Sequence, residues 1–534
     1  MNHDIFRLAF AAIAPAAALT AQILPPAPIM LRDITPGGGN GPQFLTVFQG
    51  RVWFAANDQQ VGDEMWVTDG TPQGTQLFLD LLPGSAGSYP TDYCVLGDRM
   101  FFGARGSGAG QELWVTNGTV AGTQLFADLN PGVIGSDPKH LTRIGNEIYF
   151  SADAGGGPEP WVTDGTVAGT RSLGDFRPGT GGSYPEHFTG YPGQVVFSAI
   201  PDPMLGRELC ITDGTIAGTQ LLKDINPGVY YGVPQRPMVA WGGHVYFAAN
   251  DGVNGQEIWR TDFTAAGTVL FNDFLPGAGS SQPRDFQRDY LDRGILFTAG
   301  RQNTTGDVFW YDGTNWGWFA PGGINIPPPL SSVYPQNVRA IGSRKIYCCA
   351  STPNHSLELV VMDHTLALGM AVYDINTAGG SNPRDFTLLG DTVVFVATDA
   401  THGPELWALH NGATERPVEQ GCSGSRLDVE DPVLGRDIYY RITTDVPNAA
   451  PMTMIGWPAQ TPFVLPWVSA CPVHVDPGLT AFAFYPAGWQ SGTIHVPGDV
   501  ALNGLLLVMQ CYVGSATVPS AYDFTNPVYL HLGL

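Results

Sequence analysis

A unit that recurs along most of the chain constrains its fold more than any other feature. The clearest copy, ELWVTNGTVAGTQLFADLNPG, runs from Glu112 to Gly132. A polar turn residue marks each copy, and successive marks lie 47 to 51 residues apart, at Asp69, Asn117, Asp164, Asp213, Asp262, Asp312, Asp363 and His410. These positions define eight units, and a repeat of this length is typical of arrays built from small structural modules.

Each unit is predicted to form four short strands. In the second unit they are Thr91–Leu96, Arg99–Ala104, Glu112–Thr116 and Gln124–Leu129, where apolar and polar residues alternate with the period of a strand. Four strands in about 50 residues match one blade of a β-propeller, and a closed ring of blades leaves few sheet edges exposed. We therefore predict an all-β fold with an eight-bladed β-propeller over residues 29–418, and seven blades as the alternative.

The two ends of the repeat indicate how the ring closes. Ile29–Gly37 copies the fourth strand and exit of a unit, although no complete unit precedes it. The eighth unit keeps its third strand, ELWAL, but the residues that follow are a poor copy of a fourth strand. The N-terminal strand is therefore predicted to complete the last blade, with Met30 pairing beside Leu406.

The polar residues that recur in each unit are those of a turn. Asp or Asn followed by Gly is the strongest short signal for a tight hairpin, so TDGTxAGT is predicted to join the third and fourth strands. The Trp of ELW, three residues before the turn, is predicted to pack between blades because aromatic side chains bury the most area.

The motifs ELWVTNGTVAGT, ELCITDGTIAGT and EMWVTDGTPQGT resemble the ELWxxDGT repeat of secreted and surface proteins of bacteria. The resemblance covers about residues 30–418 and is strongest in units one to five, whereas units six to eight lose parts of the motif. It implies a propeller-like array and an extracellular location, and it implies no particular activity.

Pairs of carboxylates recur at a fixed spacing. Each third strand begins with Glu or Asp, and in six units an Asp follows the Glu by 16 residues, which places the two opposite each other across a hairpin. Like charges at about 5 Å repel by roughly 3 kcal/mol at an effective dielectric near 20. Bound Ca²⁺, capture of the carboxylate by backbone N–H groups of the following loop, or a bulge would each relieve the repulsion, and the last two are preferred. The residues of the Ca²⁺ hypothesis are Glu64, Asp80, Glu112, Asp128, Glu257 and Asp273.

Charge and motifs narrow the classes of function. Acidic residues outnumber basic residues 48 to 25, giving a net charge of −23, and no Lys/Arg cluster is present, so nucleic acid is excluded as a partner. HExxH, GxSxG and P-loop motifs are absent from the sequence. In a propeller the loops between second and third strands share a face with the loops that leave the fourth strands, and loops on a rigid scaffold frequently bind ligands.

We therefore expect a non-catalytic binding or interaction protein that recognises a surface, a glycan or a protein with one propeller face. No cofactor is expected, apart from the Ca²⁺ of the hypothesis above. Two alternatives stay open. One is an extracellular enzyme, a hydrolase or lyase of a polymer, with its site in the propeller tunnel; the other is a structural component of an envelope.

The N-terminus is predicted to direct export. Arg7 precedes an apolar, Ala-rich run from Leu8 to Ala21, which indicates a signal peptide over residues 1–21. This run is too short to cross a bilayer and no longer apolar run follows, so a secreted or cell-surface protein without a transmembrane segment is expected.

A second domain is predicted after the repeat. Residues 421–534 read as strands separated by Gly and Pro turns, which favours a small β-sandwich. GCSGS, CPVHVD and IHVPGDVALNGLLLVMQ resemble a C-terminal β-domain appended to large secreted bacterial proteins. The chain has seven Cys and no CxxC, so a zinc cluster is not expected, and Cys422–Cys471 is the predicted disulfide.

The Ca²⁺ hypothesis has a direct test. If the carboxylate pairs bind the ion, a chelator lowers the melting temperature of the protein and added Ca²⁺ restores it, because a ligand that binds only the folded state stabilises it. A melting temperature that neither treatment changes would contradict the hypothesis.

Overall fold

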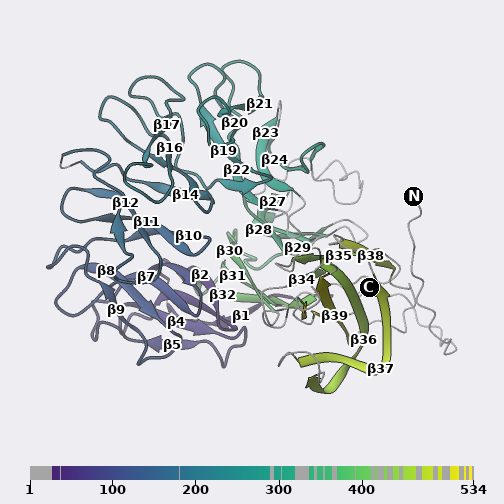
Figure 1. Cartoon of the computed structure of the whole chain (residues 1–534). Coiled ribbons are helices and arrows are strands. Elements are labelled where there is room, and N and C mark those ends of the chain that lie inside the picture. Colours follow the sequence, from purple (N-terminus) through teal and green to yellow (C-terminus); the bar gives the residue numbers. More distant parts are fainter. Residues whose placement is uncertain are drawn as a thin grey trace.

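The described part of the chain folds entirely into strands, turns and loops (Figure 1). Within it, no helix has the length and apolar character that crossing a membrane requires. The predicted signal peptide, Cys422 and Cys471 lie outside the described residues. The computed structural model describes residues 27–36, 38–179, 181–288, 294–301, 304–318, 336–341, 345–352, 355–363, 370–390, 392–410, 415–417, 426–429, 437–443, 449–464, 472–484, 491–495, 506–515, 522–524 and 528–531.

Eight antiparallel sheets of four strands form within residues 29–410 of this part, one for each repeat, so the count is eight blades and not seven. Blades one to four comprise β2 (Gln43–Phe48), β3 (Arg51–Asn57), β4 (Asp63–Thr68) and β5 (Gln76–Leu79); β6 (Thr91–Leu96), β7 (Arg99–Arg105), β8 (Gln111–Thr116) and β9 (Gln124–Ala127); β10 (Lys139–Ile144), β11 (Glu147–Asp153), β12 (Pro158–Thr163) and β13 (Arg171–Ser172); and β14 (Glu186–Tyr191), β15 (Gln194–Ala199), β16 (Glu208–Thr212) and β17 (Gln220–Lys223).

The remaining blades follow the same order, except that the last takes its outer strand from the N-terminus. Blades five to eight comprise β18 (Val239–Trp241), β19 (His244–Asn250), β20 (Gln256–Thr261) and β21 (Val269–Asn272); β22 (Arg284–Arg288), β23 (Ile295–Arg301), β24 (Thr304–Tyr311) and β25 (Trp316–Trp318); β26 (Gln336–Ile341), β27 (Lys345–Thr352), β28 (His355–Asp363) and β29 (Met370–Tyr373); and β30 (Arg384–Leu389), β31 (Thr392–Asp399), β32 (Gly403–His410) and β1 (Ile29–Arg32).

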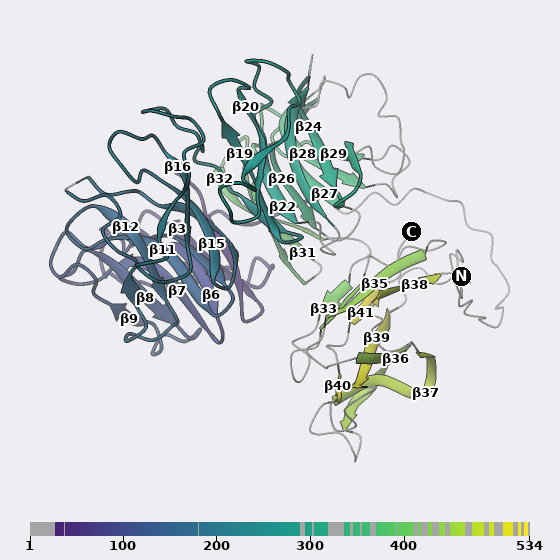
Figure 2. The same ribbon diagram turned by 45° about the horizontal axis from the view of Figure 1, so that its top comes forward.

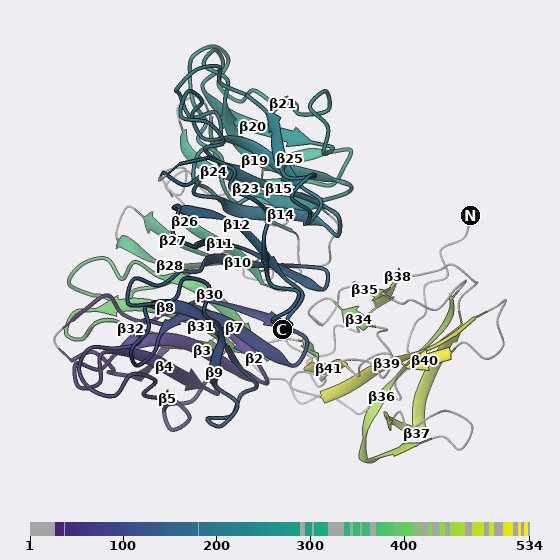
Figure 3. The same cartoon turned by 60° about the vertical axis from the view of Figure 1, so that its left-hand side comes forward.

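The blades form a closed ring. The first strand of each blade contacts the first strand of the next, from β2 through β30, and β30 contacts β2 again. Figures 1 and 3 show the blades following one another in chain order, from purple to green. The first strands are therefore innermost, and the short fourth strands lie at the rim.

The N-terminal strand closes the ring as predicted. In β1, Met30 pairs with Trp407 and Arg32 with Leu406 of β32, in antiparallel register. Leu31 is 2% exposed and packs between blades eight and one with Val396 and Trp66. The first and last strands of the propeller are thus held in one sheet, which couples the two ends of the repeat.

The region after the propeller forms two further antiparallel sheets (Figure 2). Glu415–Pro417, just after the eighth unit, forms β33 and pairs with the last strand of this region, not with a blade. The strands of the two sheets are β33 (Glu415–Pro417), β36 (Ala449–Val464), β37 (Pro472–Phe484), β39 (Leu506–Ser515), β40 (Tyr522–Phe524) and β41 (Val528–His531) in one, and β34 (Arg426–Val429), β35 (Asp437–Thr443) and β38 (Ser491–His495) in the other.

The hydrophobic core lies between neighbouring blades. Each cluster of buried side chains combines strands from two adjacent blades, and the aromatic residue of the ELW motif takes part in it, as the sequence predicted. Trp66 joins the cluster between blades eight and one, Trp161 packs against the cluster between blades two and three, and Trp259 joins that between blades four and five.

The DGT segment is a self-contained turn. In blade one, Asp69 Oδ1 accepts hydrogen bonds from Thr71 N at 2.9 Å and Thr71 Oγ1 at 2.6 Å, and Gly70 has a φ of +87°. Thr75 Oγ1 returns a bond to Thr71 O at 2.8 Å. The Thr71 hydroxyl bond is the main reason that the pKa of Asp69 is lowered. The Asp and Thr side chains of the motif bond within the turn, as the sequence predicted.

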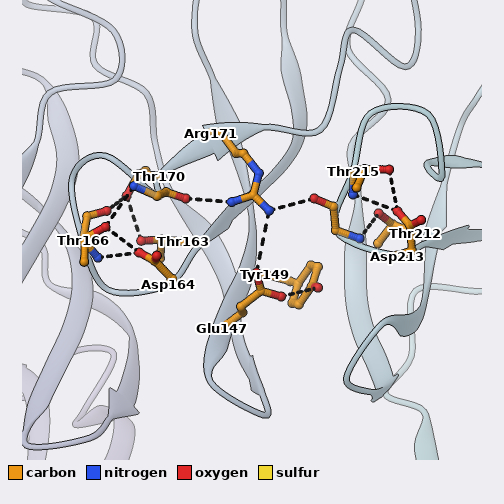
Figure 4. Close-up of polar contacts among 12 residues, drawn as sticks. Glu147, Tyr149, Thr163, Asp164, Thr166, Thr170, Arg171, Thr212, Asp213 and Thr215 are labelled. Carbon is orange, nitrogen blue, oxygen red and sulfur yellow. Dashed lines mark hydrogen bonds and ion pairs between the residues drawn. The ribbon is translucent and has the colours of Figure 1, made fainter.

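These turns also join the blades. Arg171 Nη2 of blade three donates to Gly214 O in the turn of blade four at 2.9 Å, and Glu147 lies 3.7 Å from the same guanidinium nitrogen (Figure 4). Four other blade pairs use the same arrangement, in which a side chain of one blade donates to a turn carbonyl of the next: Arg32 to Thr75, Gln49 to Asn117, Arg99 to Gly165, and Lys223 to Thr268.

If β1 closes the ring, a substitution of its buried residue Leu31 should destabilise the whole propeller. Leu31→Ala is expected to lower the free energy of unfolding by about 2 to 5 kcal/mol, because it leaves a cavity between the first and last blades. Ile29→Ala is the matched control in the same strand; Ile29 is 42% exposed, so the change should stay within about 0.5 kcal/mol. Urea denaturation measures both, and equal effects of the two substitutions would contradict closure through Leu31.

Candidate functional site

In blades one to five and seven, a buried glutamate near the start of the third strand binds the loop that leaves the blade, called here the exit loop. In blade one, Glu64 is fully buried. Its Oε2 accepts hydrogen bonds from Leu81 N at 2.9 Å and Ser88 Oγ at 2.6 Å, and its Oε1 accepts one from Ser88 N at 2.7 Å. A single carboxylate thus fixes both ends of the exit loop.

The same clamp recurs around the ring. In each copy the carboxylate accepts a backbone N–H 17 residues later and both the N–H and the hydroxyl of a Ser 23 or 24 residues later, for Glu112, Glu159, Glu257 and Glu358. Glu405 of blade eight instead binds Ile34 N at 3.0 Å and Thr35 N at 2.8 Å, which follow β1. Capture by backbone N–H groups is therefore the arrangement observed at these carboxylates.

The strand pairing next to the carboxylates of the Ca²⁺ hypothesis agrees with the predicted hairpin symmetry. Met65 pairs with Leu79, so Glu64 and Asp80 occupy the next opposing positions, and the register in blades two and five places Glu112 with Asp128 and Glu257 with Asp273 in the same way. In the described part of the chain, no group of three His, Cys, Asp or Glu side chains is arranged to hold a metal ion. The Ca²⁺ site stays a prediction.

A second repeated motif lies in the exit loops, and the sequence analysis missed it. Five exit loops end in Ser-x-Pro-x-Asp/His, beginning at Ser88, Ser136, Ser183, Ser281 and Ser381. The Ser completes the clamp, and both the residue after it and the final Asp or His adopt a left-handed backbone conformation, as in Tyr89 and Asp92. Aligning the segments before each first strand, which show no hydrophobic periodicity, would have found the motif.

The final residue of this motif lines the innermost strand and reaches the next blade. Its side chain, or that of the equivalent Asn, bonds to backbone of the neighbouring first strand or the segment just before it: Asp92 to His140, His187 to Gln235, Asp285 to Val338, and Asn337 to Pro383. The motif therefore joins the blades at the tunnel, as the DGT turns do on the opposite face.

Blade four departs from these repeated features. Gly232 stands where five other units have the clamping Ser, and Tyr231 stands where blades one to three have a glycine of positive φ. Its loop between second and third strands is one residue longer than those of blades one, two and five. It also carries Arg207, a residue only 2% exposed.

Without the Ser, the clamp of blade four lacks a hydroxyl donor to its glutamate. Glu208 is fully buried and accepts Ile225 N at 2.7 Å and Gly232 N at 2.8 Å, without a hydroxyl donor. Burial raises the pKa of Glu208 to about 7, and the nearby Asp224 adds to the shift.

Exposed apolar side chains gather on the two loops of this blade. Met204, between the second and third strands, is 72% exposed, and Tyr230 and Tyr231 of the exit loop are 69% and 56% exposed. The two loops contact each other, since Gly206 N donates to Gly228 O at 3.0 Å and Gly206 packs against the Tyr230 carbonyl. The exposed side chains therefore lie on two loops that are bonded to each other.

A polar network on the innermost strands β10 and β14 adjoins these loops. Glu186 Oε1 accepts a hydrogen bond from Gln235 Nε2 at 2.7 Å and lies 3.5 Å from Arg207 Nη2. The Nε2 atoms of His140 and His187 lie 4.0 and 3.9 Å from the same carboxylate. Burial, together with His140 and Arg207, lowers the pKa of His187 to about 4, so His187 is neutral at physiological pH.

Arg207 links the network to the loops. Its Nη1 donates to Tyr184 O at 2.7 Å and Ser198 O at 3.2 Å, while its buried Nε has no hydrogen-bond partner in the described part of the chain. Burial lowers the pKa of Arg207, and Glu186 and Tyr231 oppose that shift. We call the following residues the blade-four site: Tyr184, Glu186, His187, Met204, Arg207, Tyr230, Tyr231 and Gln235.

Comparison with known proteins gives no family. No protein-family model matches the chain, and no curated protein is similar to it in sequence. Among solved structures, a prolyl endopeptidase aligns with 76% of this chain and 55% of its own at 9% identity and a TM-score of 0.40. A puromycin-hydrolysing peptidase of Mycobacterium tuberculosis aligns with 70% and 60% at 11% identity and 0.41, and TolB from Acinetobacter baumannii with 60% and 78% at 9% identity and 0.30.

This chain thus spans little more than half the length of the two peptidases. At such identities and TM-scores the likeness carries no information about activity. The propeller is established by the strand pairing and by the contacts between first strands around the ring.

The raised pKa of Glu208 predicts a pH dependence of stability. Because the folded-state pKa is raised from 4.5 to about 7, the folded protein binds more protons than the unfolded chain in that range. Stability from this group is present below the unfolded pKa and is lost as pH rises through about 7. Glu208→Gln is expected to flatten the fall in the free energy of unfolding between about pH 5 and about pH 8.

Urea denaturation over that pH range measures the effect. Glu147→Gln is the control, because Glu147 lies on the opposite face and is partly exposed beside Arg171. If wild type and Glu208→Gln lose stability with the same slope, the carboxyl does not titrate as proposed.

Proposed function

We propose that this protein is an extracellular, non-catalytic binding protein that recognises its ligand with the loop face of blade four. The observation that carries the proposal is the departure of blade four from the repeat. Blades one, two, three and seven hold their exit loops with the Ser clamp and a Gly before it, and blade five uses the same clamp after Ser280. The Tyr231–Gly232 pair and buried Arg207 are therefore not needed to build a blade.

The exposed apolar side chains support the same surface. Contiguous exposed apolar area is uncommon on soluble proteins and marks binding sites. The opposite face also exposes Val120, Val167 and Ile216, but these occupy the same position of successive turns and thus follow the repeat. On the loop face, Val253 of blade five and Ile134 of blade two are exposed at the positions of Met204 and Tyr230, so Tyr231 is the exposed side chain that departs from the repeat.

The loops of blade four are ordered by internal bonds. Gly232 N and Val233 N both donate to Arg207 O at 3.0 Å, and Glu208 binds both ends of the exit loop. A preformed surface binds with less loss of conformational entropy than a flexible one, so these bonds favour recognition.

Export is supported by sequence. The apolar run after Arg7 is typical of a signal peptide, and the repeat resembles ELWxxDGT units of secreted and surface proteins. We therefore place the proposed binding activity outside the cell.

An enzyme is the second candidate, and one observation favours it. His140, Glu186 and His187 lie together at the tunnel, and a carboxylate beside imidazoles is a common acid–base arrangement. Turnover of a soluble polysaccharide or peptide by the purified protein, abolished by Glu186→Gln, would establish this alternative in place of simple binding.

The proposal predicts which face binds. The triple variant Met204→Ser, Tyr230→Ser, Tyr231→Ser should weaken retention of the full chain on immobilised polysaccharides, peptides or lipid vesicles by at least about tenfold for whichever probe retains the wild type. The matched control is Val120→Ser, Val167→Ser, Ile216→Ser, which removes comparably exposed apolar groups from the opposite face.

Both triple variants should melt within a few degrees of the wild type, because all six side chains are exposed. Equal retention of the blade-four variant and the wild type, or a loss confined to the opposite-face variant, would contradict the proposal.

A further inference from the structure

We propose that the blade-four site binds a neutral, hydroxyl-rich oligosaccharide. The inference rests on the proposed function and names its ligand class. Three features meet at this site: exposed tyrosine rings, a paired carboxylate and guanidinium, and a neutral imidazole.

The tyrosines offer flat, partly apolar surfaces. Tyr184 is 45% exposed, and Tyr230 and Tyr231 are more exposed still. Their backbones are fixed, since the Tyr184 carbonyl accepts Arg207 Nη1 at 2.7 Å and the exit loop is bound to blade four at both ends. An aromatic ring with a hydroxyl combines an apolar face with a polar tip, which matches a sugar ring with apolar C–H faces and a polar rim.

Hydrogen-bonding groups lie beside these rings in fixed positions. The Glu186 carboxylate, held by Gln235 Nε2 at 2.7 Å, is an acceptor for a ligand hydroxyl. The Arg207 guanidinium lies 3.5 Å away and is almost fully buried, so it holds this carboxylate in place from the protein side. The hydroxyl groups of a sugar are donors, so the exposed part of the Glu186 carboxylate can accept a hydrogen bond from one of them.

The charge of the site selects a neutral ligand. Glu186 and Arg207 compensate each other, and the pKa of His187 near 4 leaves its imidazole uncharged at physiological pH. The chain as a whole carries a net charge of −23, which repels polyanions such as uronic acid polymers.

The backbone of the site favours a sugar over a peptide. Peptide ligands commonly add a strand to an open sheet edge through main-chain bonds. Here the loop amides of Gly206, Gly232 and Val233 already donate to backbone carbonyls of the same blade. Recognition therefore falls to side chains, which suits a ligand without its own amide ladder.

Affinity electrophoresis and calorimetry of the full chain test the inference. The probes are a soluble neutral glucan, a galactomannan and, as a charged comparison, polygalacturonate, with an unbiased set of unstructured peptides in parallel. We expect a neutral glycan to bind, and Tyr230→Ala with Tyr231→Ala to weaken that binding at least about tenfold.

Glu186→Gln tests the polar half of the site. It should weaken glycan binding and also lower the melting temperature, because the buried Arg207 guanidinium loses its compensating carboxylate, so binding is measured at a temperature where the variant is fully folded. Val167→Ser on the opposite face is the control and should bind as the wild type does.

The outcomes separate the inference from the proposed function. Binding of polygalacturonate alone, or neutral-glycan binding that the tyrosine variants leave unchanged, overturns the oligosaccharide inference. Binding of peptides alone, lost in the tyrosine variants, overturns the inference and leaves the binding function standing. If no probe binds, or every bound probe is indifferent to the blade-four variants, both fail.

Discussion

The capture of each exit loop by a buried glutamate is the interaction on which the rest of this structure depends. A carboxylate removed from water is costly unless donors surround it, and here the donors are the N–H groups at the two ends of a loop. These hydrogen bonds have two effects. The N–H groups of the loop compensate the cost of burying the Glu64 carboxylate, and the carboxylate holds the Gly-rich loop in a single conformation. Removing either partner would leave the other unsatisfied.

The clamp also determines how blades join. Ser88 ends the captured loop, a proline follows, and Asp92 then enters the innermost strand, where its side chain reaches the backbone of the next blade. On the opposite face, side chains such as Arg171 donate to the turn of the following blade. Many pairs of neighbouring blades are thus joined by two kinds of hydrogen bond, one at the innermost strands and one at the turns on the opposite face. Since this fastening is repeated, one blade can vary, and blade four is where the loops carry Arg207 and exposed tyrosines.

The sequence predicted the parts of this architecture that have a simple period. Alternating residues located the strands of blade two to within two residues, the spacing of the turn residues gave eight blades, and the orphan copy at Ile29 predicted closure with β32. The register beside the carboxylates Glu64 and Asp80, where Met65 pairs with Leu79, also followed from hairpin symmetry. Their environment did not, because the donors to Glu64 lie 17 to 24 residues later in a segment without periodicity.

The candidate site was likewise predicted in part from the sequence and in part revealed only by the structure. By itself the sequence determined the ring of blades and the face on which variable loops gather, because both depend on patterns that repeat along the chain. Only the tertiary structure decided that Glu186, Arg207, Tyr231 and Gln235 meet, since they come from three separate segments of the chain. It also decided the charge states there: desolvation, which depends on packing and not on residue type, leaves His187 neutral and raises the pKa of Glu208.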